Sequence, residues 1–336
     1  MTVVYVSHPS NRLDQYFGPR ALQQLRSIAE VRLNPQPREL DTAELIAAAQ
    51  GCDALIAYRQ TPGPRALFAG LPQLAAFIRC AVDIRTVDVA AASEHGVLVT
   101  QASAGFVAAV SEWIVGVMVD LARGITRYAA EYHANGSAVP VMGRQLRGAT
   151  LGVIGHGQIG SDLASLGIAL GMQVLVNTPE TVPARDGLQQ AALAALLEQS
   201  DFVVCLAPAN ARTANLMNAE TFGAMKKGSF FINAARGELV DEAALLAALD
   251  SGHLAGCALD VGRAPDQMPS PALARHPLVI ATPHIGGLTV PAIEHQALET
   301  VTQLEQLQRG TMPRGVVNPE HALRLQRWRA QAGKLA

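Results

Sequence analysis

The sequence predicts an α/β protein built from two doubly wound parallel-sheet domains. Short apolar runs that suit buried strands alternate with helical stretches along the chain, which is typical of parallel sheets covered by helices on both faces. A length of 336 residues indicates about two domains, and 49% hydrophobic against 16% charged residues indicates a large core. One glycine-rich turn, at residues 155–160, lies near the middle of the chain.

The first hundred residues are expected to form one α/β domain without a glycine-rich phosphate loop of its own. Strands are expected at residues 3–6, 31–33, 54–58, 74–80 and 97–100. Helical patterns are expected at residues 16–29 and 42–50, and Gly51 is a natural stop signal for the second of these helices.

A long helix is expected at residues 106–125. It is apolar on almost every side, and a helix of this kind must be buried on every side. We expect it to lie against a second copy of the chain in a homodimer. The alternative is a helix sandwiched between two domains of one chain.

The second half continues the alternation around the glycine-rich turn. Strands are expected at residues 172–176, 202–206, 229–233, 256–260 and 278–281. Helices are expected at residues 159–170, 219–225, 241–251 and 290–309, followed by an extended segment at 314–319 and a basic amphipathic helix.

The glycine-rich turn fits G-x-G-x-x-G between a buried strand and a helix. Gly155 would make the tight turn, Gly157 would let the backbone approach a pyrophosphate, and Gly160 would let helix and strand pack closely. Amides at the start of the helix, at Gln158 and Ile159, would face the phosphates. The strand, turn, helix and second strand together form the βαβ unit that such a motif requires. The alternative is a glycine turn that binds nothing.

Composition argues against several other classes of protein. A net charge of −2 gives no electrostatic case for binding nucleic acid or an anionic membrane. The four cysteines have no metal-type spacing, so no metal site is expected, and they suit a reducing compartment. No signal peptide and no membrane-spanning stretch are recognisable. The expected location is the cytoplasm.

Candidate chemical residues follow three late strands, at residues 233–237, 258–261 and 282–287. Ligands of open α/β sheets collect at this edge. The guanidinium of Arg236 suits bidentate hydrogen bonding to a carboxylate. The imidazole of His284 suits proton transfer to or from an oxygen while a hydride is transferred at the attached carbon. The alternatives are a salt-bridge arginine and a structural histidine.

These stretches resemble the D-isomer-specific 2-hydroxyacid dehydrogenase family over about residues 50–320. The motifs that carry the resemblance are residues 151–160, 225–247, 254–261 and 280–287. The resemblance implies a flavodoxin-like substrate domain (residues 1–102 and 289–336) and a Rossmann NAD(P)-binding domain (103–288), with a cleft between. It also implies a dimer that reduces a small 2-oxo acid, such as glyoxylate or hydroxypyruvate, to the D-2-hydroxy acid, or runs the reverse.

The resemblance assigns roles to individual residues. Arg236 would bind substrate, His284 would be the acid/base, and Arg59 falls where some members place a second substrate arginine. The expected substrate contacts are Arg59, Val82 and Asp83. The expected cofactor contacts are Gly155, Gly157, Gln158, Ile159, Gly160, Asn177, Thr178, Ala207, Pro208, Ala234, Ala235, Arg236, Asp260, His284 and Gly286.

The partner of the catalytic histidine departs from the family pattern. The family normally has a Glu five residues beyond the equivalent of Asp260, and Pro265 stands there. We expect Asp266 to take this catalytic role, since a carboxylate beside the ring would favour imidazolium. Gln267 is the rival candidate.

The substrate loop departs from the family's glycine-rich turn at Asp83. This carboxylate would repel a bound carboxylate unless Arg85 or Arg59 offsets it. The alternative is that Asp83 points away from the substrate and pairs with Arg85.

The third departure concerns the choice between NADP and NAD. Thr178 stands where NAD-selective folds place an acid for the ribose hydroxyls, and its lack of charge favours NADP(H). However, no Arg or Lys follows before Arg185, and Glu180 can still reach the ribose.

Two rival functions remain beside the 2-oxo acid reductase. One is an NAD(P)-sensing, corepressor-like binding protein with altered catalysis, since fold does not fix function. The other is oxidation of a substrate such as formate or phosphite, which also fits the missing Glu.

Overall fold

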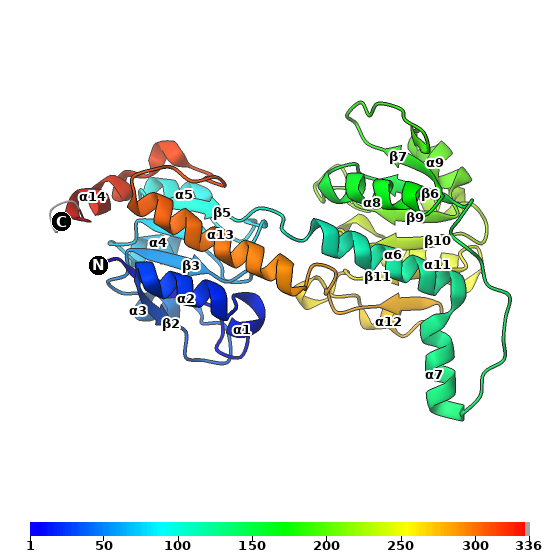
Figure 1. Ribbon diagram of the computed structural model, residues 1–336, viewed down its shortest axis with the longest axis horizontal. Coiled ribbons are helices and arrows are strands. Elements are labelled where there is room, and N and C mark those ends of the chain that lie inside the picture. The colour runs from blue at the N-terminus through cyan, green and yellow to red at the C-terminus, as the bar shows by residue number, and fades with distance from the viewer. Residues whose placement is uncertain (333–336) are drawn as a thin grey trace. The chain divides into compact units, whose positions relative to one another are not determined.

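The computed structural model describes residues 1–332, which form two compact units. Unit 1 contains Met1–Gly105 and the chain from Val290 onward, and unit 2 is Phe106–Thr289. Each unit has its own parallel sheet (Figure 1). The expectation of two doubly wound parallel-sheet domains is therefore confirmed.

Unit 1 contains a five-stranded parallel sheet in the order β2-β1-β3-β4-β5. Its strands are β1 (Val3–Val6), β2 (Glu30–Leu33), β3 (Ala54–Ala57), β4 (Ala76–Arg79) and β5 (Leu98–Gln101). Its helices are α1 (Leu13–Tyr16), α2 (Pro19–Ile28), α3 (Thr42–Ala48), α4 (Arg65–Gly70), α5 (Val89–Glu94), α13 (Val290–Gln308) and α14 (Leu323–Ala332). This strand order is flavodoxin-like, with its switch point between β1 and β3.

Alternating residues of the central strands pack the two faces of this sheet. Val4, Ile56 and Ile78 lie in one core with α2 and α13, while Leu55 and Phe77 lie in another with α3, α4 and α5. Figure 1 shows α13, in orange, beside the blue α2, although the two are far apart in sequence.

Buried hydrogen bonds join the C-terminal segment to β5. Asn318 accepts from Val99 N at 2.7 Å and donates to Val97 O at 2.9 Å. Val317 N also donates to Val99 O at 2.9 Å. The segment after α13 is thus built into the first sheet.

Unit 2 contains a seven-stranded parallel sheet in the order β12-β11-β10-β9-β6-β7-β8. Its strands are β6 (Thr150–Ile154), β7 (Gln173–Asn177), β8 (Leu188–Gln190), β9 (Phe202–Cys205), β10 (Phe230–Asn233), β11 (Gly256–Leu259) and β12 (Val279–Ala281). Its helices are α6 (Val107–Arg123), α7 (Ile125–Asn135), α8 (Gln158–Ala169), α9 (Leu193–Gln199), α10 (Ala219–Ala224), α11 (Glu242–Asp250) and α12 (Pro271–Ala274). The chain reverses direction across the sheet between β6 and β9, which is the Rossmann switch point.

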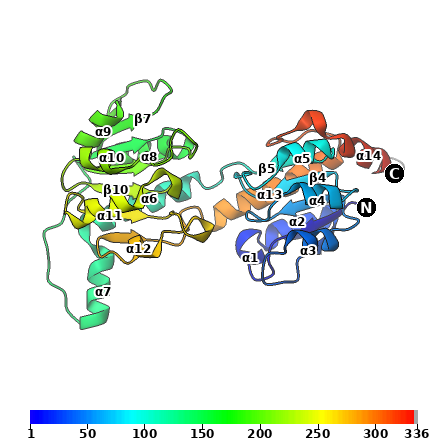
Figure 2. The same ribbon diagram turned by 180° about the vertical axis from the view of Figure 1, so that it is seen from behind.

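Helices cover both faces of the second sheet. Helices α6 and α8 pack on one face with Val153 and Val204, and the other face packs Val203 and Phe231 against α9, α10 and α11. Figure 2, turned by 180° from Figure 1, shows α9, α10 and α11 clearly.

Several expected elements differ in the structure. The single helix expected at residues 16–29 is two helices, because Gly18 adopts φ +84° and Pro19 begins α2. Helix α6 ends at Gly124 in the left-handed region, and α7 follows directly. Within the single chain, Glu112 and Gly116 of α6 are exposed, so the chain itself does not cover this helix on every side.

Candidate active site

The glycine-rich loop joins β6 to α8 at the switch point of the second sheet. A Cβ on Gly155 would lie 2.6 Å from Leu206 O, and a Cβ on Gly160 would lie 2.1 Å from Gly155 O. Both positions therefore require glycine on steric grounds. Gly157 differs, because a Cβ there would have no neighbour within 4 Å.

This arrangement fits a dinucleotide pyrophosphate. The exposed Gly157 immediately precedes the twelve-residue helix α8, whose first amides have no partner within the helix. Gln158, Ile159 and Gly160 supply these amides at the positive end of the helix dipole. Burial lowers the pKa of His156, and the charge of Arg185 lowers it further, so this loop histidine is neutral at pH 7.

The ends of β7 and β9 flank the loop on either side. Gly155 N donates to Asn177 O at 2.8 Å, and the Asn177 amide donates to Ala191 O at 3.0 Å. After β9, Ala207 is buried while Pro208 is exposed. The predicted cofactor residues Asn177, Ala207 and Pro208 thus lie at strand ends next to the glycine loop.

Thr178 and Glu180 form a fixed carboxylate site after β7. The Thr178 hydroxyl donates to the Glu180 carboxylate, and this bond lowers the Glu180 pKa. Gln190 of β8 donates to Thr178 O and Glu180 O, each at 2.9 Å, and accepts from Val182 N at 2.9 Å. The loop that carries Glu180 is therefore held at both ends.

The loop carrying Arg236 is shaped by the buried side chain of Asn233. Asn233 donates to Arg236 O at 3.0 Å and accepts from Ala235 N at 3.1 Å. A Cβ on Gly237 would lie 2.1 Å from Gly262 O, so this turn packs directly on the loop after β11. The small side chains of Ala234 and Ala235 leave room for another group to approach this loop closely.

Asp260 fixes the loop that carries His284. Its carboxylate is 3% exposed and accepts from Thr282 Oγ1 at 2.6 Å, Ile285 N at 2.8 Å and Gly286 N at 2.7 Å. A Cβ on Gly286 would lie 2.8 Å from this carboxylate. Asp260 thus acts as an anchor for the histidine loop.

The ring of His284 contacts the backbone of Asp266. Its Nδ1 lies 2.9 Å from Asp266 O, a contact in which the ring N–H donates. Asp266, Gln267 and His284 all adopt positive φ, between 56° and 59°. The Gln267 side chain donates to Glu238 Oε1 at 3.3 Å. The bond to the ring thus comes from the main chain of the residue expected to supply a carboxylate.

Arg236, Asp260 and His284 follow β10, β11 and β12, which are neighbours in the sheet. Adjacent strands lie about 4.8 Å apart, so the outer two of these strand ends are about 10 Å apart. The Arg236 guanidinium donates to Ala235 O at 2.7 Å, within its own loop. The fold therefore brings the loops of Arg236 and His284 to one edge of the second sheet.

The predicted substrate residues of unit 1 lie after β3 and β4. The Arg59 guanidinium lies 5.3 Å from the centre of the Tyr16 ring. Asp83 accepts from Arg85 N at 2.9 Å and pairs with the Arg85 guanidinium, Nη2 to Oδ2, at 2.9 Å. Of the two expectations for Asp83, the structure shows the ion pair with Arg85. Val82 directly precedes this pair in the loop.

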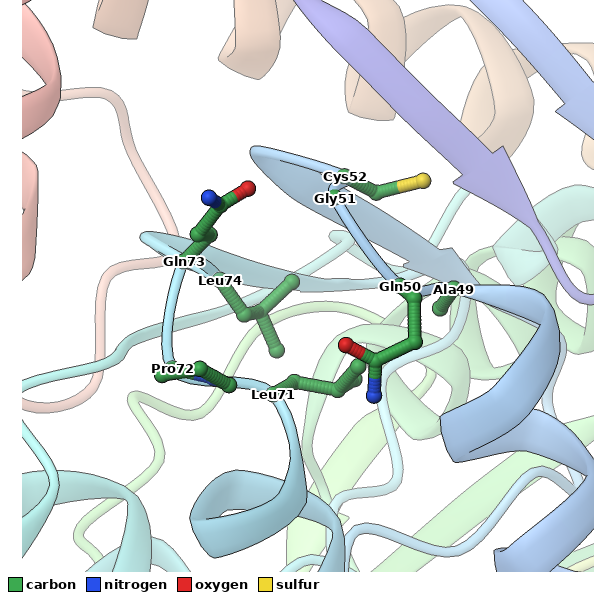
Figure 3. Close-up of a pocket in the computed structure, with 8 residues that line it drawn as sticks. All are labelled: Ala49, Gln50, Gly51, Cys52, Leu71, Pro72, Gln73 and Leu74. Atoms are coloured by element: carbon green, nitrogen blue, oxygen red, sulfur yellow. The ribbon is translucent and has the colours of Figure 1, made fainter.

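Other features of the described chain do not resemble a cofactor site. A cavity of about 120 Å³ lies at the amino-terminal edge of the first sheet, and ligand pockets usually exceed about 300 Å³ (Figure 3). It is lined by Ala49, Gln50, Gly51, Cys52, Leu71, Pro72, Gln73 and Leu74. Within residues 1–332, no cluster of three metal-ligating side chains and no helix fit to cross a membrane is found.

Comparisons with known proteins identify the family. Residues 115–286 match the family model described as D-isomer specific 2-hydroxyacid dehydrogenase, NAD binding domain. The (S)-sulfolactate dehydrogenase of Chromohalobacter salexigens is 36% identical over 274 residues, covering 79% of this chain and 88% of the relative. The D-lactate dehydrogenase structure from Escherichia coli is 26% identical, with a TM-score of 0.82 over 94% of this chain and all of that one.

The chain belongs to the D-isomer specific 2-hydroxyacid dehydrogenase family. The resemblance seen in the motifs is confirmed, and with it the expectation of an NAD-binding domain. The D-3-phosphoglycerate dehydrogenase 3 of Arabidopsis thaliana is 33% identical over 315 residues, covering 92% of this chain but 53% of the relative. The chain therefore spans about half the length of the phosphoglycerate dehydrogenases it matches.

Sequence reasoning missed the polar residues that hold these loops in place, of which Asn233 and Asp260 are buried and Gln190 is half-buried. Asn233, Asp260 and Gln190 act through hydrogen bonds to main-chain groups, and only Asp260 was singled out, as a cofactor contact. The signal available for Asn233 was a polar residue at the end of an apolar strand.

The glycine loop gives a sharp test of dinucleotide binding. Gly157→Ala should fold with a melting temperature within about 2 °C of wild type, because its methyl meets no protein atom. It should weaken NADH binding about tenfold or more, because the methyl enters the space beside the α8 amides. Gly160→Ala is the contrast, and should lower the melting temperature. Fluorescence titration and thermal unfolding measure both effects, and unchanged NADH affinity in Gly157→Ala would contradict the assignment.

Proposed function

We propose that the protein reduces a small 2-oxo acid to the D-2-hydroxy acid with a nicotinamide cofactor, or runs the reverse reaction. The observation that carries this proposal is the placement of Arg236 and His284 on either side of Asp260, at the carboxyl edge of an NAD-binding sheet. When bound, the nicotinamide supplies or accepts the hydride. The chain's own residues supply charge and the proton.

Arg236 and His284 divide this chemistry between them. The Arg236 guanidinium donates to the substrate's carboxylate and carbonyl oxygens, which orients the carbonyl and stabilises negative charge developing on its oxygen. His284 binds Asp266 O through Nδ1, so Nε2 is the atom that exchanges a proton with the substrate oxygen. Arg59 and Val82 are proposed to contact the substrate on the basis of the resemblance alone.

Replacing His284 tests the reductase proposal. His284→Asn should lower kcat by about 10²-fold or more, because the general acid is lost, while NADH affinity stays within about twofold. The assay follows NADH absorbance with glyoxylate, hydroxypyruvate, pyruvate, and sulfonated and phosphorylated 2-oxo acids. His276→Asn, another histidine of unit 2, is the control. If wild type binds NADH but turns over none of these acids, the cofactor-sensing alternative, favoured by Pro265 in place of Glu, replaces the reductase.

We further propose that the cofactor is NAD(H) rather than NADP(H). The lack of charge at Thr178 favours NADP(H) when that residue is considered alone. Glu180, however, is ionised and hydrogen-bonded to the Thr178 hydroxyl, which puts an acid beside the position that would hold the ribose. A carboxylate there accepts from ribose hydroxyls and repels a 2′-phosphate.

The cofactor preference can be measured directly. Wild type should prefer NADH, and Glu180→Gln should reduce the ratio of kcat/KM for NADH over NADPH about tenfold, because the repulsive charge is gone. Arg185→Met serves as the control, since Arg185 hydrogen-bonds Ser165 on α8. A wild-type preference for NADPH that disappears in Arg185→Met would reverse the assignment.

We propose that the chain forms a homodimer through α7 and the segment that follows it. Five large apolar side chains are exposed there, namely Ile125, Tyr132, Val139, Val141 and Met142. The segment is held in place, since Val141 N donates to the Tyr128 hydroxyl at 2.6 Å and Arg144 N to Ala122 O at 2.9 Å. Figure 1 shows α7 extending away from the seven-stranded sheet. An ordered apolar patch of this kind suits a second copy of the chain.

The dimer has a simple test by sedimentation equilibrium. Wild type should sediment at twice the chain mass of 35.4 kDa. The double variant Val139→Glu with Met142→Glu should sediment as a monomer, because charge is placed in a buried apolar contact. Leu170→Glu, at an exposed apolar site directly after α8, should stay dimeric. A monomeric wild type would refute the proposal.

The expected cytoplasmic location is also proposed. It is supported by the four cysteines, all of which are buried as free thiols. Fractionation of cells that produce the chain would test it, and recovery outside the cytoplasmic fraction would overturn it.

A further inference from the structure

A buried arginine lies beneath the candidate substrate loops of unit 1. Arg79 is the last residue of β4 and is 1% exposed. Its Nη1 donates to Tyr58 O at 2.7 Å and to Thr61 O at 2.6 Å, and its Nε donates to Asp83 O at 3.0 Å. A fourth bond joins Nη2 to the Thr86 hydroxyl.

These four bonds tie together two loops at the carboxyl edge of the first sheet. The loop at residues 58–61 follows β3 and carries Arg59, and the loop at residues 80–86 follows β4 and carries Val82. Further bonds support the first loop, since Tyr58 N donates to Ser7 Oγ at 2.9 Å and Ser7 Oγ lies 2.8 Å from Thr61 Oγ1. Within the described chain, one guanidinium is thus a shared anchor for both loops.

The groups that Arg79 binds are neutral, so holding the two loops together does not by itself require a positive charge. All four oxygens it binds belong to carbonyl or hydroxyl groups, so no formal negative charge meets the guanidinium directly. Burial lowers the Arg79 pKa to about 10, with the charge of Asp83 acting in the opposite direction. Burying a cation is costly unless a negative charge compensates it.

The carboxylate in the loop at residues 80–86, that of Asp83, already has a cationic partner. The Asp83 carboxylate is paired with Arg85, so the pair is neutral overall. Arg79 would therefore attract a carboxylate bound to main-chain amides of this loop, while Arg85 reduces the opposing repulsion from Asp83.

We propose that Arg79 is a positioning residue for an anionic substrate. It holds loops 58–61 and 80–86 in one arrangement, and its buried charge attracts a carboxylate bound at their surface. Arg79 does not touch the substrate and acts through the loops. The identity of that carboxylate as part of a 2-oxo acid rests on the proposed function.

The test measures binding of oxamate, an unreactive carboxylate that mimics a 2-oxo acid, by calorimetry with NADH present. Arg79→Gln removes the charge and most of the bonds, and should weaken oxamate binding about tenfold or more. Arg79→Lys keeps the charge and should bind with intermediate affinity. In steady-state assays, Arg79→Gln should raise KM for the 2-oxo acid while KM for NADH stays within about twofold.

Arg324 provides a matched control in the same unit. It donates to Leu71 O at 2.6 Å, Leu74 O at 3.4 Å and Phe68 O at 3.3 Å, before the start of β4 at the opposite edge of the sheet. Arg324→Gln removes the same kind of bonds and should leave oxamate affinity within about twofold. Should Arg79→Gln fail to fold, Arg79→Lys and Arg324→Lys give the same comparison.

The outcomes separate the two proposals. Oxamate affinity unchanged in Arg79→Gln, or lowered equally in Arg324→Gln, overturns the positioning role. Equal losses in Arg79→Lys and Arg79→Gln overturn the role of charge. A third outcome is that wild type binds oxamate in an Arg79-dependent way, but none of the 2-oxo acids supports NADH oxidation. In that case the positioning role stands and the reductase proposal fails.

Discussion

The backbone leaves the hydrogen-bond ladder of a parallel sheet at its carboxyl edge, and its polar groups need other partners there. This constraint shapes both units. Asn233 and Asp260 bind main-chain groups after β10, β11 and β12, and Arg79 does so after β3 and β4. The loops they hold carry Arg236, His284 and Arg59, so the candidate chemistry depends on buried polar side chains that do not themselves react.

Much of the fold could be predicted from the sequence, because parallel strands buried on both faces are nearly continuous apolar runs. The segments that differ depend on weaker signals. Strand β8 has only three residues, Leu188–Gln190, and is defined by pairing with β7. Helix α9 was missed because its short apolar pattern lies among small residues. The break between α1 and α2 was marked by Gly18-Pro19, a signal that was present but overlooked.

Some residues of the candidate site could likewise be predicted from the sequence, whereas others could not. Gly155, Gly160, Arg236 and His284 could be found from motifs, because steric demand and chemistry fix the residue type. The contact of His284 with Asp266 O could not, since it depends on a backbone conformation rather than on a side chain. Glu180 shows a related limit. Its side chain matters because Thr178 and Gln190 fix its place, and those contacts come from the tertiary fold.

Pro265 stands where the resemblance implies a Glu, and the contact to the His284 ring comes from a main-chain carbonyl. Asp266, Gln267 and His284 sit in the left-handed region, a conformation that costs about 1–3 kcal/mol for each residue of this kind. The three hydrogen bonds to Asp260 offset that cost on the His284 side, since a bond to a charged group contributes about 1.5–3 kcal/mol. This conformation places the Asp266 carbonyl oxygen beside Nδ1 of His284. Because a carbonyl oxygen does not titrate, this contact orients the ring without introducing a second ionisable group.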